Sequence, residues 1–299
     1  MVVDTTAQPK NIAFPTDSGL YAKVIAQCER IAQATGRPLT IDRQQVRRLR
    51  MRQGARRTAQ GRRRAKRATR QLQAIAWKAL RAVRRWAAPK WQEVLANCAR
   101  VLTQKRTDKA KIYSLHEPGV YCMAREKVRT KYEFGSKVAL TMTPRGVIVA
   151  ALSFARNTHD NHTVEPMLEQ MKRLTQHRPA VLIGDRGFRG RCQFGDTRLV
   201  LPRSDDSHLS DWQRAQGRRR YRLRAGIEPR IGHLKSDFRL GRNFLKGRLG
   251  DALNLLLAAS ASNLRRWCNA VLSALFAFFS RLFSVTFLPP ASHPFLRAD

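Results

Sequence analysis

The sequence predicts a mixed α/β fold in which helices cover one sheet and a large helical segment is inserted after the first strand. Three observations favour this class. Short apolar segments with a two-residue period indicate strands, longer segments with a 3.6-residue period indicate helices, and both kinds occur along the chain. Hydrophobic residues make up 43% of the 299 residues, which is enough to bury a sizeable core and excludes wholesale disorder.

The chain opens with a short strand, Val2-Val3-Asp4, and the pattern becomes helical by about Asp17. Asp17 or Ser18 is expected to cap the first helix. Amphipathic and increasingly basic helical segments then continue to roughly Thr107. These features predict a first strand within residues 1–15 and a basic helical insertion over residues 16–130.

A basic block dominates the insertion. Between Arg43 and Arg70 there are 13 Lys or Arg residues and no Asp or Glu. We expect basic helices here, and a solvated or disordered arm is the alternative for residues 56–70. The next stretch has apolar residues at roughly helical spacing, namely Leu72, Ile75, Ala76, Leu80, Val83 and Trp86.

An alternating segment that begins at Tyr132 predicts a half-buried strand. Pro144-Arg145-Gly146 then makes a turn, and the apolar run over 147–154 suits an antiparallel partner, so a hairpin is expected. One face of the strand is predicted to carry Tyr132, Phe134, Ser136, Val138, Leu140 and Met142, and the other Glu133, Lys137 and Thr141.

Residues 131–250 are expected to supply the rest of the core, and residues 251–299 C-terminal apolar helices. Thr163 precedes a helix with Pro166 in its first turn. A buried strand over 180–184 and a shorter one over 199–201 follow. Helical patterns then cover 217–240, 251–268 and 270–287. The helix after Thr163 should bury Leu168, Met171 and Leu174 on one side.

The charge balance indicates the class of partner. The chain has 58 Lys and Arg against 21 Asp and Glu, a formal net charge of +37. A field of this size implies a polyanionic partner, because an acidic small metabolite would not require it.

The five cysteines lie far apart and include no C-x-x-C pair, so neither a zinc knuckle nor a disulfide framework is predicted. We expect a reducing, cytoplasmic location. The N-terminus lacks the pattern of a signal peptide. The mostly apolar stretch over 267–280 is short for a bilayer, so a buried or docking helix is expected and a membrane helix is the alternative.

Acidic residues in so basic a chain are candidate site residues, because a buried carboxylate is costly unless it is paired or bound to metal. Asp4 and Asp185 each follow an apolar strand, and strand ends are where open α/β sheets place their sites. Neighbouring strand ends can bring the two together. The alternatives are a polar residue at a frayed terminus for Asp4 and a turn cap for Asp185.

The basic segment over 221–235 supplies a third acid. On one continuous helix, the apolar positions Leu223, Ile227, Ile231, Leu234 and Phe238 form an arc of roughly 80°. A neighbouring arc of roughly 60° carries Tyr221, Arg224, Glu228 and Lys235. Pro229 can kink this helix or mark a helix start nearby. The alternative for Glu228 is an ordinary ion pair on a basic surface helix.

These residues resemble a known family. Tyr221, Arg224, Glu228 and Lys235 reproduce the spacing Y-(2)-R-(3)-E-(6)-K, which is similar to the signature of DDE transposases of the insertion sequence 4 and insertion sequence 5 families. Three further stretches resemble the insertion sequence 5 group: Val3-Asp4-Thr5-Thr6 running on through residues 10–17, Lys131-Tyr132-Glu133-Phe134-Gly135, and Gly184-Asp185-Arg186-Gly187-Phe188.

The resemblance implies a ribonuclease-H-like catalytic core that cleaves DNA and joins it to new DNA. It implies Asp4, Asp185 and Glu228 as catalytic residues and as ligands of Mg²⁺, which Mn²⁺ can replace, since paired metal ions stabilise the attacking and the leaving oxygen. Family members usually carry a DNA-binding region ahead of the first catalytic Asp, whereas Asp4 is the fourth residue here. The chain therefore looks truncated, or like the downstream product of a split reading frame.

The expected partners are double-stranded DNA and transposon ends, together with a possible second copy of the chain and no membrane. Nucleoid association follows from DNA binding. By resemblance, Arg224 and Lys235 would grip phosphates near the cut and Tyr221 would contact a displaced nucleotide. The remaining candidate DNA contacts are Arg186 and Arg230, and, in the basic block, Arg47, Arg48, Arg63 and Arg64.

Several alternatives stay open. A non-catalytic DNA-binding fragment or regulator, or a metal-dependent nuclease without strand transfer, would share much of this pattern. His159, Asp160 and His162 could bind zinc, although Asp160 and Asn161 suit the turn before the next helix better. The C-terminal helices could form a dimer surface or pack on the core. Trp77, Trp86 and Trp91 could stack on bases, although Trp77 and Trp86 suit a helix core better.

Overall fold

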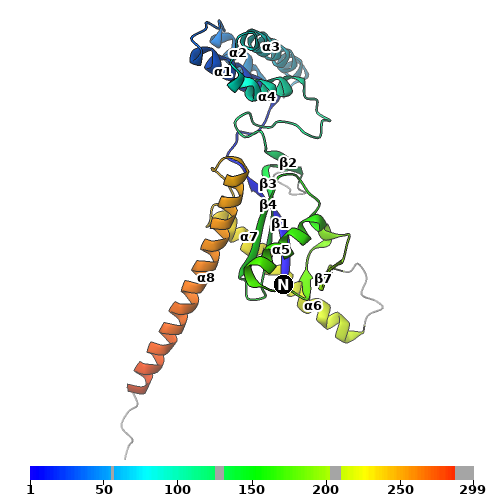
Figure 1. Ribbon diagram of the computed structural model, residues 1–299, viewed down its shortest axis with the longest axis vertical. Helices are drawn as coiled ribbons and strands as arrows, with labels where there is room; N and C mark the ends of the chain where they lie inside the picture. Colours follow the sequence, from blue (N-terminus) through cyan, green and yellow to red (C-terminus); the bar gives the residue numbers. More distant parts are fainter. Residues whose placement is uncertain (55–56, 125–130, 203–209, 287–299) are drawn as a thin grey trace, which may run out of the picture.

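The computed structural model describes residues 1–54, 57–124, 131–202 and 210–286 (Figure 1). In these residues one sheet of seven strands has the order β2-β3-β1-β5-β7-β6, and β4 pairs with β3 beside that path. The sheet is mixed, because β1 is antiparallel to β3 and parallel to β5. The strands are β1 Val2–Pro9, β2 Tyr121–Ala124, β3 Tyr132–Met142, β4 Ile148–Phe154, β5 Val181–Ile183, β6 Gln193–Phe194 and β7 Thr197–Val200.

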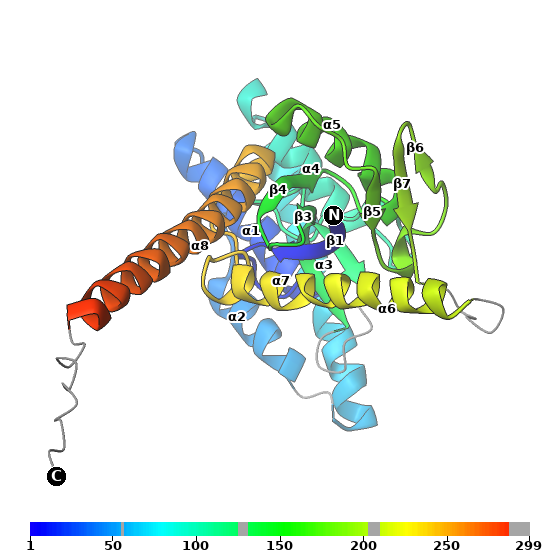
Figure 2. The ribbon, with the colours of Figure 1, turned by 90° about the horizontal axis from the view of Figure 1, so that it is seen from below.

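Helices cover both faces of this sheet. Helix α5 (Val164–Thr175) packs on one face with Val3 and Leu182. Helices α7 (Ile227–Ser236) and α8 (Gly247–Thr286) pack on the other face, and Figure 2 shows the sheet between α5 and the line of α6 (Asp211–Ala225) and α7. The predicted mixed sheet flanked by helices is confirmed, and the arrangement is consistent with a ribonuclease-H-like fold.

Strand β1 is longer than its apolar residues predict. It pairs with β3 along its whole length, from Val2 opposite Met142 to Pro9 opposite Gly135. Asp4 therefore lies inside β1, and the prediction that it ends the first strand is wrong. The polar residues after Asp4 carry no apolar pattern from which a strand could be predicted. Hydrogen bonding to β3 keeps this segment extended.

Strand β3 is central, and the prediction of a half-buried strand is wrong for its second half. From Val138 to Met142 every residue is buried, because α5 covers one face and α8 the other. The hairpin of β3 and β4 through the turn at Gly146 is confirmed. In α5, Leu168 and Met171 are buried as expected, whereas Leu174, in the last turn, is exposed.

The chain leaves the sheet on one side of Gly135 and returns to it on the other. Pro9, at the end of β1, and Tyr121, at the start of β2, both pair with this residue from opposite sides. A Cβ at Gly135 would lie 2.0 Å from the carbonyl oxygen of Gln8, so any side chain would displace the β1 backbone.

A break divides the single basic helix that the sequence predicts. Helix α6 ends at Ala225 and α7 begins at Ile227. Pro229 causes the break, because its ring clashes with the carbonyl four residues earlier and it has no N–H to donate. Gly226 nevertheless keeps right-handed helical dihedral angles (φ −68°, ψ −16°), so the helix direction continues across the break (Figure 2).

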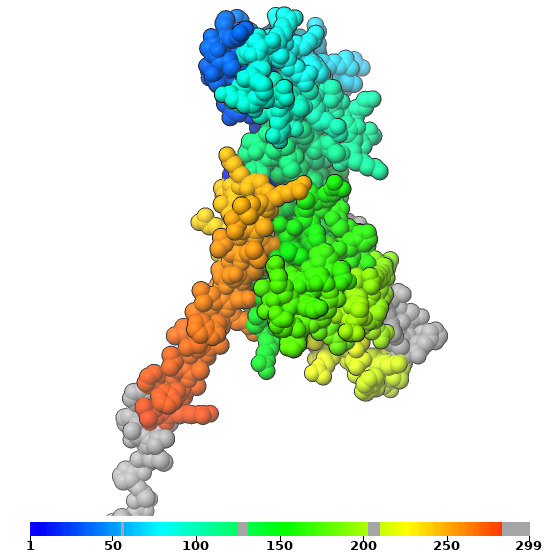
Figure 3. All heavy atoms as spheres, viewed as in Figure 1, coloured from blue at the N-terminus to red at the C-terminus, as the bar shows by residue number. Residues whose placement is uncertain are grey.

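One continuous helix, α8, replaces the two C-terminal helices that the sequence predicts. No Gly or Pro interrupts residues 251–286, so nothing in the sequence stops the helix. The first half of α8 packs on β4, where the Asn263 side chain bonds both the N–H and the carbonyl of Ile148 at 2.9 and 2.7 Å. The second half projects from the body (Figure 3). The predicted end at Phe287 lies outside the described residues.

None of the described helices combines the length and apolar character that a bilayer span requires. The membrane alternative for the stretch 267–280 therefore receives no support.

A buried lysine connects three parts of the chain. The Nζ of Lys10, whose side chain is 2% exposed, lies 2.7 Å from Asp251 on α8 and 3.5 Å from Glu117 before β2. It also donates to the carbonyl of Leu245 at 2.6 Å. The charge is therefore buried but paired, which is the condition for its tolerance inside a protein.

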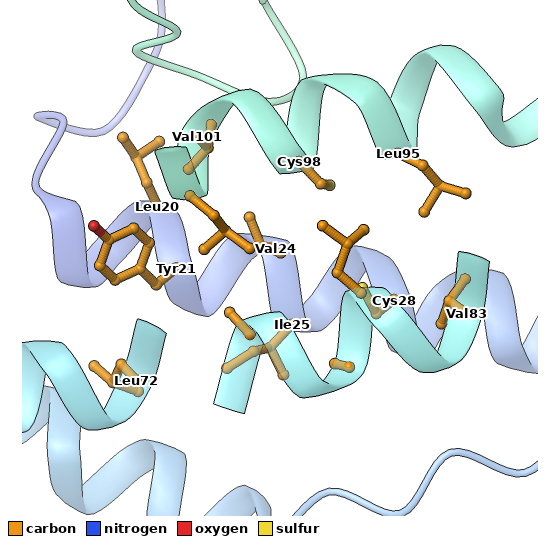
Figure 4. Packing of buried hydrophobic residues seen from close by; sticks show 14 of the residues in the cluster. Leu20, Tyr21, Val24, Ile25, Cys28, Leu72, Val83, Leu95, Cys98 and Val101 are labelled. Carbon is orange, nitrogen blue, oxygen red and sulfur yellow. The ribbon is translucent and has the colours of Figure 1, made fainter. Parts of the chain in front are cut away.

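The helical insertion has its own core (Figure 4). Thr16, rather than Asp17 or Ser18, caps α1 through a 3.2 Å bond from the Gly19 N–H. The helical portion ends at Thr103, before the predicted Thr107, and β2 returns the chain to the sheet. The insertion consists of α1 Asp17–Ala34, α2 Arg43–Met51, α3 Ala59–Arg84 and α4 Gln92–Thr103, with short 3-10 turns at Arg52–Gly54 and Pro89–Trp91.

The apolar positions predicted for α3 are found in this core. Leu72, Ala76, Leu80 and Val83 are buried, and the disordered alternative for the basic block does not hold for residues 59–70, which are helical. The insertion core also receives the partly buried side chains of Ile75, Trp77, Trp86 and Trp91.

Candidate functional site

Strand register brings Asp4 and Asp185 to one face of the sheet. Val2 on β1 pairs in parallel with Ile183 on β5, so two residues further along each segment Asp4 and Asp185 follow on the same side. Val2 and Ile183 both pack against Ile227 of α7. The two carboxylates therefore face the side of the sheet that α7 covers.

Helix α7 adds the third predicted acid, because Glu228 directly follows the buried Ile227. Arg224, one turn earlier on α6, lies between the acids: its Nη2 is 3.1 Å from Oε1 of Glu228 and 3.8 Å from Oδ2 of Asp185. The Nε of Arg224 is buried and has no hydrogen-bond partner in the described structure. The guanidinium thus has unused donor capacity at this site.

These groups border one cavity of about 780 Å³. Strand β1, the turn after β5, and helices α6 and α7 all contribute to its wall. The wall consists of Asp4, Thr5, Thr6, Met123, Ala124, Lys137, Asn157, Asp160, Asp185, Arg224, Glu228, Ile231, Gly232 and Lys235.

The cavity wall is acidic, in contrast to the chain as a whole. Four carboxylates and three cationic side chains line it, whereas the chain carries 58 basic and 21 acidic residues. Such a reversal of the local charge favours the binding of a cation over the binding of an anion. The carboxylates are those of Asp4, Asp160, Asp185 and Glu228, and the cations those of Lys137, Arg224 and Lys235.

Burial disfavours the ionised form of Asp4. Desolvation is the main cause that raises its pKa from 3.8 to about 6, and the nearby carboxylates of Asp185 and Glu228 act in the same direction. A 2.7 Å hydrogen bond from the Thr5 N–H to Oδ1 of Asp4 and the charge of Arg224 act against the shift. Asp185 is held differently, since its Oδ1 accepts the N–H of Gly187 at 2.8 Å.

Asp160 is the site residue that sequence reasoning missed. Its Oδ1 forms an ion pair with Nζ of Lys137 and accepts a 2.9 Å hydrogen bond from the Thr5 hydroxyl. It also lies against the turn after β5, because a Cβ on Gly187 would be 2.6 Å from its Oδ2. The rarity of acids in this chain, which singled out Asp4 and Asp185, is the signal that could have found it.

The zinc alternative at His159, Asp160 and His162 is not supported. Asp160 is paired with Lys137, and Nδ1 of His159 accepts the N–H of Asn161 at 3.3 Å. The expected place of Asp160 in the turn before α5 is confirmed, since it begins the 3-10 turn Asp160–Thr163, but its carboxylate also faces the cavity. The Asn161 side chain instead holds the loop after Asp185, donating to the carbonyls of Phe188 and Arg191.

The other residues predicted to contact DNA lie in different parts of the structure. Lys235 lines the cavity, Tyr221 lies half-buried on α6, and Arg186 is exposed beside Asp185. Arg230 lies on the side of α7 that faces α8. The structure brings none of the four predicted insertion arginines to the cavity wall; all are exposed on the helical bundle, namely Arg47, Arg48, Arg63 and Arg64.

The donors around the cavity suit a hard divalent ion in kind, because Asp4, Asp185 and Glu228 offer carboxylate oxygens from three separate elements. In the part of the chain that the structure describes, no three His, Cys, Asp or Glu side chains gather closely enough to hold an ion. The Arg224 guanidinium, between Asp185 and Glu228, occupies part of the space in which such ligands would meet.

Comparisons with known proteins indicate the family of the chain. Neither a curated protein nor a solved structure matches the chain. The family model described as the transposase DDE domain matches residues 103–264, which is more than half of the sequence. The matched range contains Asp160, Asp185 and Glu228 together with most of the sheet and both cavity helices. The chain belongs to the family of transposases that share the DDE domain.

Proposed function

We propose that the chain is a transposase of the insertion sequence 5 family, with an insertion sequence 4-like signature, and that it catalyses metal-dependent DNA cleavage and strand transfer. The observation that carries the proposal is that Asp4, Asp185 and Glu228 line the wall of one cavity in a chain of this family. A mere DNA-binding protein has no need of carboxylates from two sheet segments and a helix at one place.

Asp4, Asp185 and Glu228 would be both the catalytic triad and the ligands of Mg²⁺, for which Mn²⁺ can substitute. When bound, the metal supplies positive charge at the attacking and the leaving oxygen of the phosphodiester. Arg224 then has two roles: it neutralises Asp185 and Glu228 in the free protein, and its guanidinium, which lines the cavity, can donate to a DNA phosphate.

The remaining groups near the cavity would bind DNA. Lys235 supplies a second positive charge for a phosphate, and Tyr221 on α6 is a candidate to stack on a displaced nucleotide. Arg186 and Arg230 would contact the DNA backbone beside the cavity. None of these contacts reads a base edge, so they predict strength of binding rather than sequence preference.

The basic insertion would follow the DNA backbone. We divide the chain into a first catalytic strand (1–15), the insertion (16–130), the rest of the catalytic core (131–250) and a C-terminal segment (251–299). The exposed positions Arg47, Arg48, Arg63 and Arg64 give the insertion a cationic surface remote from the cavity. Double-stranded DNA and transposon ends are the proposed partners, and binding to them would associate the chain with the nucleoid in the cytoplasm.

We also propose a homodimer through the projecting half of α8. Its apolar side chains are exposed over nearly five turns, although apolar surface of this extent normally finds a partner. Leu264, Trp267, Val271, Leu275, Phe278 and Leu282 form one stripe, an arc of about 80° on an ideal helix.

Nicking of supercoiled plasmid by the purified chain tests the catalytic proposal. With Mg²⁺ or Mn²⁺ we expect nicking that Asp185→Asn or a chelator reduces about 10²–10³-fold, because a lost metal ligand removes several kcal/mol of transition-state stabilisation. The matched control is Asp196→Asn, an exposed Asp in the turn before β7, which should cut normally. Equal nicking by Asp185→Asn and wild type would reject the site.

A joining assay separates a transposase from a nuclease. Pre-cut ends with free 3′ hydroxyls should be joined to a target plasmid by the wild type and not by Asp185→Asn. Cleavage without joining would leave a metal-dependent nuclease. DNA binding without either reaction would leave a non-catalytic regulator.

A further inference from the structure

A second groove lies on the other side of α7 from the cavity. It has a volume of about 400 Å³ and runs between α7 and α8. Glu228 and Lys235 face the cavity, whereas Arg230 and His233 face the groove, so α7 separates the two. Whatever binds in the groove is therefore a different group from the one at the carboxylates.

Two arginines converge in this groove. A Cβ built on Gly146, in the β3–β4 turn, would lie 3.2 Å from Nη1 of Arg266 and 3.4 Å from Nη2 of Arg230. The two guanidiniums, from α8 and α7, thus reach the same point above the turn. Gly146 has φ +82°, a conformation that favours glycine, and without a side chain it leaves this point open.

The positive charge of this pair is not balanced. Arg265, on the same groove, lies 3.1 Å from Oδ2 of Asp237, and His233 lies at the same distance from that oxygen. Hydrogen bonds from Ser236 and His233 hold the pKa of Asp237 below its usual value, so it stays ionised. Among the described residues, no carboxylate oxygen lies within 4.0 Å of Arg230 or Arg266, although both side chains are half-buried.

Like charges brought together and partly desolvated are unfavourable unless an anion joins them. A guanidinium presents its N–H groups as a planar fork that matches two phosphate oxygens. The groove also offers the buried hydroxyl of Ser262 and the side-chain amide of Asn269 as hydrogen-bond donors. This donor set, in a groove lined mainly by polar side chains, fits a phosphodiester.

We propose that the α7–α8 groove binds backbone phosphates of duplex DNA, at a contact separate from the cleavage cavity. The inference rests on the DNA binding included in the proposed function. It assigns Arg266 to the DNA-binding surface beside Arg230. It also extends that surface around α7, so that one helix contacts DNA on two sides.

The salt dependence of DNA binding tests the groove. The affinity for a random duplex of about 20 base pairs is measured over a salt series, since each phosphate contact contributes about 0.9 to the log–log slope. We expect Arg230→Gln/Arg266→Gln to reduce the slope by about 1–2 and to weaken binding about tenfold. The control is Lys172→Gln/Arg173→Gln, which removes the same two charges from exposed positions on α5, on the opposite face of the sheet.

The outcomes are distinct. Equal slopes in all three proteins overturn the proposal, and so does an equal loss in the control, which would indicate bulk charge alone. Inorganic phosphate that stabilises wild type but not the double variant, with unchanged duplex slopes, shows a free-phosphate site and also overturns it. Should the double variant fold poorly, the single variant Arg266→Gln must lower the slope by about 1.

Failure of the catalytic proposal has a different signature. Asp185→Asn should lose nicking while it keeps the wild-type slope in the duplex titration. A double-variant slope below that of wild type in a chain that never nicks DNA would support the groove and reject the catalytic proposal. Normal nicking by wild type, together with equal slopes for wild type and the double variant, would support the catalytic proposal and reject the groove.

Discussion

At the scale of single residues, the acids of the cavity are held by unlike means. Asp185 is fixed by the turn that follows β5, Glu228 by the start of α7, and Asp4 by a central strand. Asp160 connects these supports, because it accepts a hydrogen bond from Thr5 on β1 and contacts the turn at Gly187. A carboxylate that lies outside the signature motif thus braces the segments that carry two of the motif acids.

Asp4 should make the fold less stable as the pH rises. Below pH 4 its carboxyl is neutral in the folded and the unfolded chain, whereas between pH 4 and 6 only the unfolded chain ionises freely, since the folded pKa is about 6. Stability from this group is therefore lost as the pH rises through 6. The free energy of unfolding of Asp4→Asn should exceed that of wild type by up to about 3 kcal/mol at pH 7 and match it below pH 4.

Urea unfolding over pH 3–8 without divalent ions measures this difference. Asp196→Asn, an exposed control, should follow wild type at every pH. Identical pH profiles for Asp4→Asn and wild type would show that the carboxyl is not desolvated in solution.

At the scale of helices and strands, the buried Lys10 fixes the start of α8 to β1. Lys10→Met should destabilise the chain by about 3–5 kcal/mol, because it leaves the carboxylates of Asp251 and Glu117 without their cation. Urea unfolding at neutral pH measures the loss. The exposed Lys66→Met on α3 is the matched control, and a loss of less than about 1 kcal/mol for Lys10→Met would contradict the buried pairing.

Elements with a strong apolar period could be predicted from the sequence, and elements held by partners could not. The hairpin of β3 and β4, the strand β5 and the helical insertion all carry such a period. The second half of β1 does not, because pairing with β3 rather than apolar side chains keeps it extended. The two-residue strand β6 is too short for any period.

The same distinction holds for the candidate site. Asp185 and Glu228 could be found because each follows a recognisable local pattern, a strand end and a helix face. For Asp160 the sequence offers only the rarity of acids as a signal, because its place at the cavity depends on Lys137, more than twenty residues away, and on Thr5 at the other end of the core. The groove at Arg230 and Arg266 depends in the same way on the packing of α7 beside α8.

At the scale of the whole molecule, the projecting half of α8 predicts self-association. Light scattering should give twice the chain mass, and Val271→Glu/Leu275→Glu should give the monomer mass, because charges on the apolar stripe prevent helix pairing. Asn269→Glu, about 140° around an ideal helix from Leu264, is the control and should stay dimeric. A monomeric wild type at all concentrations would remove the proposed dimer.

The crossing at Gly135 has a consequence for how this architecture can vary. The chain departs after Pro9 and returns at Tyr121 on either side of one residue, two strand spacings or roughly 10 Å apart. Residues 10–120 therefore form an insertion that begins and ends beside Gly135. Because the entropy cost of closing an inserted segment rises only slowly with its length, a sheet of this design can exchange the insertion for one of another size without a change in its own strand register.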